Sequence, residues 1–148
     1  MDYYSSDVLR KEFNQEGNLL RSLIAQKMIH FETGDRTELH YPVMTISRHD
    51  GTPPWIIHSE NAVTNGGSEI IFLNGNVLVT KQNTNGESLK IIARDLRYSP
   101  AQNYAESDDN VLMSKSDSEL SGRGVQVQLE PHLNLKILAN VRRKHDPR

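Results

Sequence analysis

The sequence predicts an all-β fold in which two sheets of antiparallel strands face each other. Apolar residues alternate with polar ones over residues 71–79, 111–113 and 133–141, a pattern typical of strands that bury one face. The chain has 148 residues, of which 36% are hydrophobic, with 3 Phe and 1 Trp. This apolar content is low for a thick globular core but too regularly patterned for disorder, so a thin or open β architecture is favoured.

A repeat of 34 residues organises the chain. Two series of residues keep this interval: the small residues Ala25, Ser59 and Ala93, and downstream of them Val43, Val77 and Val111. A fourth copy has Gly122, which follows Ala93 by 29 positions. Helical-hairpin repeats have a similar period. However, Gly-Gly, Asn-Gly, Tyr-Pro and Ser-Pro pairs inside the units, together with the alternation, favour strands.

Each repeat unit is expected to bend near its small residue. A strand of period two cannot place inward residues three positions apart, so the chain must bulge wherever that spacing occurs. The spacing occurs from Ala25 to Met28, Ser59 to Ala62, Ala93 to Leu96 and Gly122 to Val125. Four V-shaped units would then stack into two facing sheets with apolar side chains packed between them. The alternative is four ordinary hairpins with unrelated turns.

Two segments have an ambiguous local pattern. Residues 19–31 carry an approximate helical stripe, but because they align with β copies of the repeat we predict a strand. Residues 55–82 read as two strands around a glycine turn. Within the second strand, Asn74-Gly75-Asn76 is predicted to be a kink or bulge, since Leu73 and Val77 keep the same parity across it.

Turns are predicted where Gly, Asn, Asp, Ser and Pro cluster, at residues 16–18, 49–54, 83–86, 99–100 and 107–110. The charged residues 142–148 are expected to fray. No linker or change of composition divides the chain, so residues 1–148 are predicted to form a single domain.

Composition and spacing point away from several chemistries. The net charge of −2 and pI of about 6.3 give no basic face, so nucleic acid is not expected as a partner. Cysteine is absent, which excludes disulfides and thiolate chemistry. The histidines lack metal-ligand spacing, and Asp108 and Asp109 are adjacent on the chain and would point in opposite directions. We therefore predict no catalytic residue, no metal site and no cofactor. Trp55 is expected to pack against the sheet rather than anchor a ligand.

Several short stretches, in order, carry a resemblance to a known family. They are DYY at residues 2–4, LIAQ at 23–26, PVMT at 42–45, PW at 54–55, LNGNVLV at 73–79, ARDLRY followed by Pro100, GVQV at 124–127 and LKILANVRRKH at 135–145. In these stretches the chain resembles LptC, the inner-membrane component of the lipopolysaccharide transport bridge, across residues 2–145. The sister proteins LptA and LptD share the repeat, and the DYY start and short C-terminal tail favour LptC.

The resemblance implies an open, twisted antiparallel β-jellyroll whose apolar interior accepts the acyl chains of lipopolysaccharide. The residues expected to face inward and line this groove are Leu23, Ala25, Met28, Leu39, Val43, Ile57, Ile71, Leu73, Val77, Ile91, Ala93, Leu96, Val111 and Val125.

The resemblance also implies docking at both ends by strand addition, with weak self-association as a further contact. The N-terminal edge (Tyr3, Tyr4, Val8) would join the periplasmic jellyroll of the inner-membrane ABC transporter. The C-terminal edge would join LptA through Leu133, Leu135, Ile137, Ala139 and Val141. Family members normally begin with a cytosolic tail and one membrane-spanning helix. This sequence lacks both and is expected to start, after an added Met1, at the periplasmic domain.

Three functions remain open from the sequence. The favoured one is a non-enzymatic lipid conduit on the periplasmic side of the inner membrane. The alternatives are an LptA-like bridge protein, or a pure interaction scaffold that does not itself carry lipid. A carbohydrate-acting enzyme on a β repeat has little support.

Overall fold

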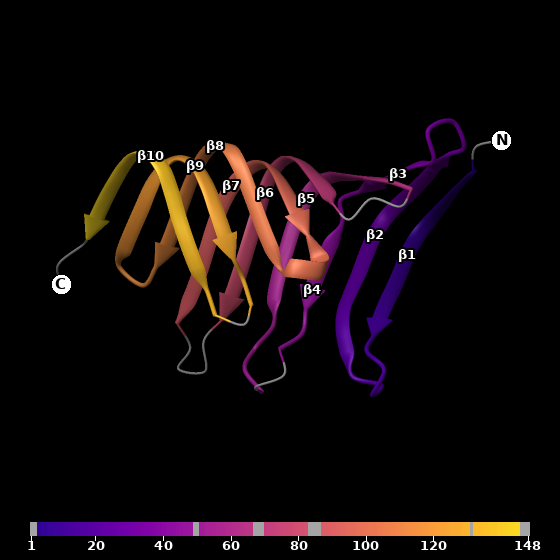
Figure 1. Ribbon diagram of the computed structural model, residues 1–148, viewed down its shortest axis with the longest axis horizontal. Coiled ribbons are helices and arrows are strands. Elements are labelled where there is room, and N and C mark those ends of the chain that lie inside the picture. The colour runs from indigo at the N-terminus through magenta and orange to yellow at the C-terminus, as the bar shows by residue number, and fades with distance from the viewer. Residues whose placement is uncertain (1–2, 49–50, 67–69, 83–86, 131, 146–148) are drawn as a thin grey trace.

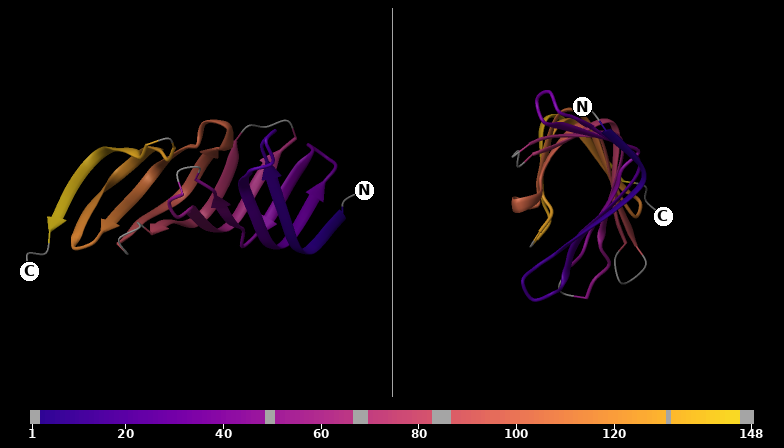
Figure 2. Two further views of the ribbon diagram at one scale, coloured as in Figure 1. Left: turned by 90° about the horizontal axis from the view of Figure 1, so that it is seen from below. Right: turned by 90° about the vertical axis from the view of Figure 1, so that its right-hand side faces the viewer.

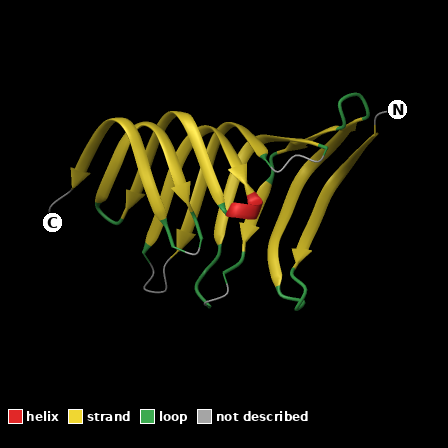
Figure 3. Ribbon diagram, viewed as in Figure 1, coloured by secondary structure: helices red, strands yellow, loops and turns green. Residues whose placement is uncertain are grey.

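The computed structural model describes residues 3–48, 51–66, 70–82, 87–130 and 132–145, and most of these lie in strands (Figure 1; Figure 3). In chain order the elements are β1 (Tyr3–Phe13), β2 (Leu19–Phe31), β3 (Arg36–His40), β4 (Val43–Ile46), β5 (Trp55–Asn65), β6 (Ile71–Gln82), β7 (Ser88–Ser99), the 3-10 helix η1 (Pro100–Gln102), β8 (Tyr104–Lys115), β9 (Ser118–Gln128) and β10 (Asn134–His145). The predicted all-β class is confirmed.

The described strands form a single antiparallel sheet of ten strands. Its order is β1-β2-β3-β5-β6-β7-β8-β9-β10, so nearly every strand pairs with its neighbours in sequence. β3 and β4 together take the place of one long strand, because β2 and β5 each pair with both of them. β1 and β10 are the two edges, and they lie at opposite ends of the molecule (Figure 1).

The strand predicted over residues 19–31 is confirmed as β2. A helical stripe would bury Leu23 and Ile24 together. Instead Leu23 packs against the core while Ile24 is 55% exposed. The pairing of β2 with β1 on one side and with β3 and β4 on the other explains this, because successive residues of a strand point to opposite faces.

The predicted bends are present in the middle of the strands. Register shifts occur in β5 after Ser59, in β6 after Leu73 and in β8 after Ser107. In β7, Ala93 and Leu96 are both buried although they are three positions apart, and two exposed residues lie between them. These bulges confirm the V-shaped units and the kink at residues 74–76.

A row of left-handed residues follows the bends from one edge strand to the other. The row consists of Asp7, Tyr41, Gly75, Asp95, Gly124 and Asn140, whose φ angles lie between 52° and 80°. Asp, Asn and Gly tolerate this region better than other residues. The bends fold the sheet over on itself, and the end-on view in Figure 2 shows the resulting curl. The two facing layers are therefore halves of one sheet, continuous through the bends.

Gly75 is held at its bend by carboxylates from both neighbouring strands. The Gly75 N–H donates to Asp95 Oδ1 at 2.9 Å, and the Asn76 N–H donates to Glu60 Oε2 at 2.7 Å. A Cβ added to Gly75 would lie 1.9 Å from the same Glu60 oxygen. The sequence thus needs glycine here both for its positive φ and for the approach of Glu60.

We expect Gly75→Ala to lower the free energy of unfolding by about 1–3 kcal/mol, since it strains the backbone and displaces Glu60. The control is Gly51→Ala, which has a similar φ of 79° but nothing within 4 Å of the added Cβ. Urea denaturation of both variants measures the difference. Equal losses would contradict a stabilising role for the Glu60 contact.

The core lies between the two halves of the sheet. Trp55 and Tyr98 are fully buried, and Ile46, Ile57 and Leu129 are 1–2% exposed. The prediction that Trp55 packs within the fold is confirmed, and the Lys81 ammonium lies 5.2 Å from the centroid of its indole ring. Burial of this apolar surface is the main stabilising term of such a fold.

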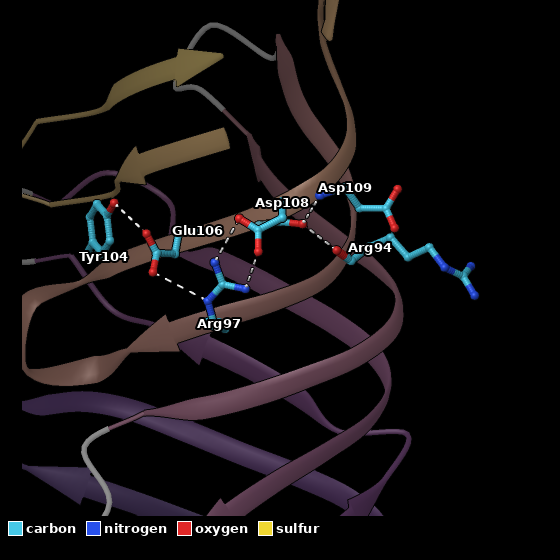
Figure 4. Close-up of polar contacts among 7 residues, drawn as sticks. Arg94, Arg97, Tyr104, Glu106, Asp108 and Asp109 are labelled. Atoms are coloured by element: carbon cyan, nitrogen blue, oxygen red, sulfur yellow. Dashed lines mark hydrogen bonds and ion pairs between the residues drawn. The ribbon is translucent and has the colours of Figure 1, made fainter. Parts of the chain in front are cut away.

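One predicted turn and the predicted fraying of the C-terminal residues are wrong. Residues 107–110 lie inside β8 as its bulge, where the buried Ser107 hydroxyl donates to the Arg94 carbonyl and accepts the Asp109 N–H (Figure 4). Asp108 is held outside by Arg97, at 3.3 and 3.4 Å. Residues 142–145, expected to fray, belong to β10 and pair with residues 118–121 of β9.

The remaining turns fit their predictions where they are described. The Gly17 N–H donates to the Asn14 carbonyl in the turn before β2, and residues 100–102 form η1. The predicted turn at 83–86, residues 49 and 50 of the 49–54 turn, and residues 146–148 lie outside the described residues.

Candidate functional site

The structure places nearly all of the residues predicted to line the groove on its inner surface. The buried members are Ala25, Leu39, Ile57, Leu73, Val77, Ile91, Ala93, Leu96, Val111 and Val125. Leu23, Met28 and Ile71 are partly buried and pack against this core.

Val43 is the exception, and its predicted inward position is wrong. It pairs with Ile24, which is 55% exposed, and with His58, which is also exposed. Its neighbour Met44 is 6% exposed and takes the inward position. The left-handed residue Tyr41 between β3 and β4 shifts the phase of the repeat here, so the 34-residue interval misplaces Val43 by one residue.

The inner surface at the N-terminal end encloses a cavity of about 330 Å³ between β1–β2 and β3–β6, which we call the N-terminal cavity. Six of the predicted inward residues line it: Leu23, Met28, Leu39, Ile57, Ile71 and Leu73. Its polar lining includes Arg10, His30 and Thr37. His30 is already engaged, with Nδ1 at 2.9 Å from the Thr37 hydroxyl and Nε2 at 3.2 Å from Asp35.

A second cavity of about 540 Å³ adjoins the first, and we call it the polar mouth. Its lining includes Glu12, Arg21, Pro100 and Ala101. The residues that line both cavities are Arg10, Leu23, Met44, Thr64 and Ile71. The two cavities therefore form one groove with an apolar floor and a charged rim.

Glu12 and Arg21 form an ion pair inside the polar mouth. The Arg21 Nε lies 3.0 Å from Glu12 Oε2, and this hydrogen bond lowers the pKa of Glu12, so the carboxylate stays charged at neutral pH. Burial works to lower the pKa of Arg21, but the Glu12 and Tyr98 contacts outweigh it and the pKa is raised. Burial raises the pKa of Tyr98 to about 12, so this hydroxyl keeps its proton.

Beyond the mouth, polar contacts join the free margins of the two halves, and we call these contacts the seam. Arg21 Nη1 donates to the Pro100 carbonyl of η1 at 3.2 Å. Arg48 Nε lies 2.7 Å from Glu130 Oε1, and the two side chains are only 11% and 17% exposed. A third cavity, of about 650 Å³, lies along these contacts and shares Arg21 and Ala101 with the polar mouth.

The C-terminal half of the interior is filled by its own side chains. Val77, Ile91, Ala93, Leu96, Val111 and Val125 are each between 1% and 3% exposed. The predicted groove residues thus divide into two sets. One set surrounds an accessible cavity, and the other forms a packed core.

The N-terminal edge strand β1 presents both polar and apolar groups. Val8 is half-buried, pairs with Ala25 and lines the N-terminal cavity, whereas Tyr4 is 71% exposed. Tyr3 begins the strand. Leu9 and Ile24 pair on the outer face and are 60% and 55% exposed.

The C-terminal edge differs from its prediction in two places. Leu133 precedes β10, which begins at Asn134, so it is not part of the edge strand. Leu135 and Ile137 pack against the core as an alternating strand requires. The alternation then fails, because Asn140 is left-handed and the register shifts between Ala139 and Arg142. Val141 is consequently 55% exposed.

A profile of the family described as "Lipopolysaccharide-assembly, LptC-related" matches residues 1–146. The chain belongs to this family. The predicted family is confirmed, and family membership gives this LptC-related chain a role in lipopolysaccharide transport.

Among solved structures, this LptC-related chain is similar to LptH from Pseudomonas aeruginosa, whose crystal structure is described as "the LptA homologous periplasmic component of the conserved lipopolysaccharide transport device". The TM-score is 0.61 at 8% sequence identity, and the match covers 99% of this chain and 96% of LptH. At this identity the likeness shows a shared fold, which confirms the predicted β-jellyroll. No curated protein sequence matches the chain significantly.

Neither the seam nor the polar mouth of the LptC-related chain was predicted from its sequence. A signal existed for Arg21, because it has the same strand parity as the inward residues Leu23 and Ala25, which is unusual for a charged group. Nothing local connects Arg21 with Pro100, which is 79 positions away, or Arg48 with Glu130. Within the described residues there is no helix long and apolar enough to cross a membrane, and no cluster of three or more potential metal ligands.

Proposed function

We propose that this LptC-related chain is a lipopolysaccharide-binding component of the transenvelope bridge on the periplasmic side of the inner membrane. It would receive lipopolysaccharide from the ABC transporter at the β1 edge and pass it to LptA at the β10 edge. The transport energy would come from the transporter's ATPase, and the chain itself would perform no catalysis. The observation that carries this proposal is an apolar cavity beside the edge strand β1, which pairs only with β2 among the described strands.

The N-terminal cavity has the properties that an acyl chain requires. Its volume of about 330 Å³ lies in the usual range of small-molecule sites, and Leu, Met and Ile side chains make up its floor. Each methylene group transferred from water into such a site contributes about 0.8 kcal/mol. Because β1 forms one wall of this cavity, a strand added to β1 would continue the same wall into the partner.

The packed C-terminal half favours a second candidate, the pure interaction scaffold. Val77 and Val125 are 1% exposed, so lipid would pass this region only if the two halves of the sheet separated. In the scaffold function the domain would join its two partners through β1 and β10 while lipid takes another route.

Site-specific photocrosslinking tests the conduit. A photoreactive residue at Leu73, on the cavity floor, is expected to capture lipopolysaccharide when the transporter is active. The same group at Ile92 is the control, because Ile92 lies on the outer face and is 44% exposed. A folded, transporter-coupled protein that captured no lipid at Leu73, or captured equal amounts at both positions, would contradict the conduit.

A further inference from the structure

We propose that Arg10 is the contact for an anionic headgroup, a phosphate or a carboxylate, of the lipid whose acyl part occupies the N-terminal cavity. This inference rests on the proposed function and adds to it a residue that selects the ligand by charge. Three observations support it: the direction of Arg10, the charge balance of the polar mouth and the packed interior beyond the cavity floor. The chemistry of the guanidinium group is the fourth argument.

Arg10 points into the groove from the edge strand. It pairs with Leu23, which lines the N-terminal cavity, and Arg10 itself lines both that cavity and the polar mouth. Its neighbours at the same parity, Val8 and Glu12, also line the groove. Arg10 is itself exposed, so its guanidinium group is accessible to a ligand while its side chain lines the groove.

The charge of Arg10 is not balanced within the mouth. Among the described residues that line the polar mouth, Glu12 is the only acidic one, and it is hydrogen-bonded to Arg21 at 3.0 Å. In the described part of the chain Arg10 forms no hydrogen bond or ion pair, although its charge helps to lower the pKa of Glu12. Among the described lining residues, two guanidinium groups and one carboxylate therefore leave one excess positive charge at the rim of the cavity.

The packed interior beyond the cavity floor determines which part of a ligand meets Arg10. An acyl chain on the cavity floor meets packed side chains in the direction of the C-terminal half, because Val77 and Ile91 are 1% and 2% exposed. The mouth adjoins the cavity at Arg10, so the polar end of the ligand can leave past this residue.

Guanidinium groups bind phosphates and carboxylates through two parallel N–H···O hydrogen bonds, and such charge-assisted bonds are stronger than neutral ones. The rim of an apolar cavity strengthens them further, because the local dielectric is lower than that of bulk water. A neutral amphiphile would gain nothing from Arg10. The site thus favours acylated ligands that carry an anion next to the chain.

The test measures binding to the purified chain of three probes: lipopolysaccharide, chemically dephosphorylated lipopolysaccharide, and the neutral apolar dye N-phenyl-1-naphthylamine. Arg10→Gln is compared with Lys11→Gln, which removes the same charge from the opposite face of the same strand. We expect Arg10→Gln to weaken lipopolysaccharide binding about tenfold, to leave dye binding unchanged, and to be largely rescued by Arg10→Lys. Lys11→Gln should change none of the affinities.

The dephosphorylated probe distinguishes the two sources of charge. If the anion is a phosphate, Arg10→Gln has no effect on dephosphorylated lipid; if it is a carboxylate, the tenfold loss persists with that probe and is still absent with the dye. Equal losses for the dye and for lipopolysaccharide, or equal losses in both variants, would overturn the headgroup site while leaving the conduit intact. A wild-type chain that bound neither lipid would overturn the proposed function itself.

Discussion

Val77→Asp is expected to unfold the domain, whereas Ile71→Asp should leave it folded and weaken lipopolysaccharide binding at least tenfold. Val77 is 1% exposed at the centre of β6, between Ser59 and Ala93 on the neighbouring strands. Burying a carboxylate there without a partner costs about 4 kcal/mol or more, a large share of the stability of an ordinary domain.

Ile71 occupies a different environment on the same strand. It is partly buried and lines both the N-terminal cavity and the polar mouth, so an aspartate there can remain hydrated. Its charge would oppose apolar chains in the cavity and repel an anionic headgroup near Arg10. We expect a loss of lipid affinity of at least tenfold with a cost of about 1–2 kcal/mol in stability.

Urea denaturation and lipid binding are measured for both variants, with Ile71→Asn as the neutral control of similar shape. The neutral variant should lose less affinity than Ile71→Asp, since it lacks the repulsion. If Ile71→Asp stayed folded, bound lipopolysaccharide like the wild type and still supported transport, the pure scaffold would be the better description. The expected contrast with Val77 would show that inward residues of one strand serve two different purposes.

The repeat predicted most of the strands and bends, because its pattern depends on residues that are close together in the sequence. The small residue followed after three positions by an apolar one, as in Ser59 and Ala62, identified bends that register shifts reveal in the sheet. The same signal decided against the helical stripe in residues 19–31. Where a bend has a different local form, as at Tyr41, the interval misplaced Val43.

The site was less predictable because it depends on how far apart the two halves of the sheet lie. Alternation assigned Leu73 and Val77 equally to the interior, but it could not indicate that one faces a cavity and the other a packed core. The seam between Arg48 and Glu130 joins loops from distant repeat units, and no sequence interval relates them. Such contacts follow from the three-dimensional closure of the sheet.

The free backbone edge of β10 is expected to be required for LptA binding, and single proline substitutions can test this without removing the strand. Deleting residues 133–145 would be a poor test. Leu135 and Ile137 cover the core residues Val125 and Val127, which are 1% and 2% exposed, so the deletion would also expose apolar surface. These contacts indicate that the domain would not remain folded after this deletion.

Arg143→Pro and Lys144→Pro form a matched pair for this purpose. Both side chains are charged and exposed, and the residues pair with Leu120 and Glu119 of β9. Because adjacent residues of a strand direct their N–H groups to opposite sides, one proline removes a ladder donor and the other removes a donor on the free edge. The first should cost about 1–3 kcal/mol of stability, and the second should leave stability nearly unchanged.

The free-edge proline is expected to weaken LptA binding at least tenfold in a calorimetric titration, because a strand added by LptA would lose a hydrogen bond and meet the proline ring. The ladder proline, at a temperature where the chain is folded, should retain more affinity. If neither variant changed the affinity, LptA would have to bind elsewhere, and the exposed side chains around Leu138 and Val141 would be the next surface to test. Equal losses in both variants would indicate that β10 acts through its fold and not through its free edge.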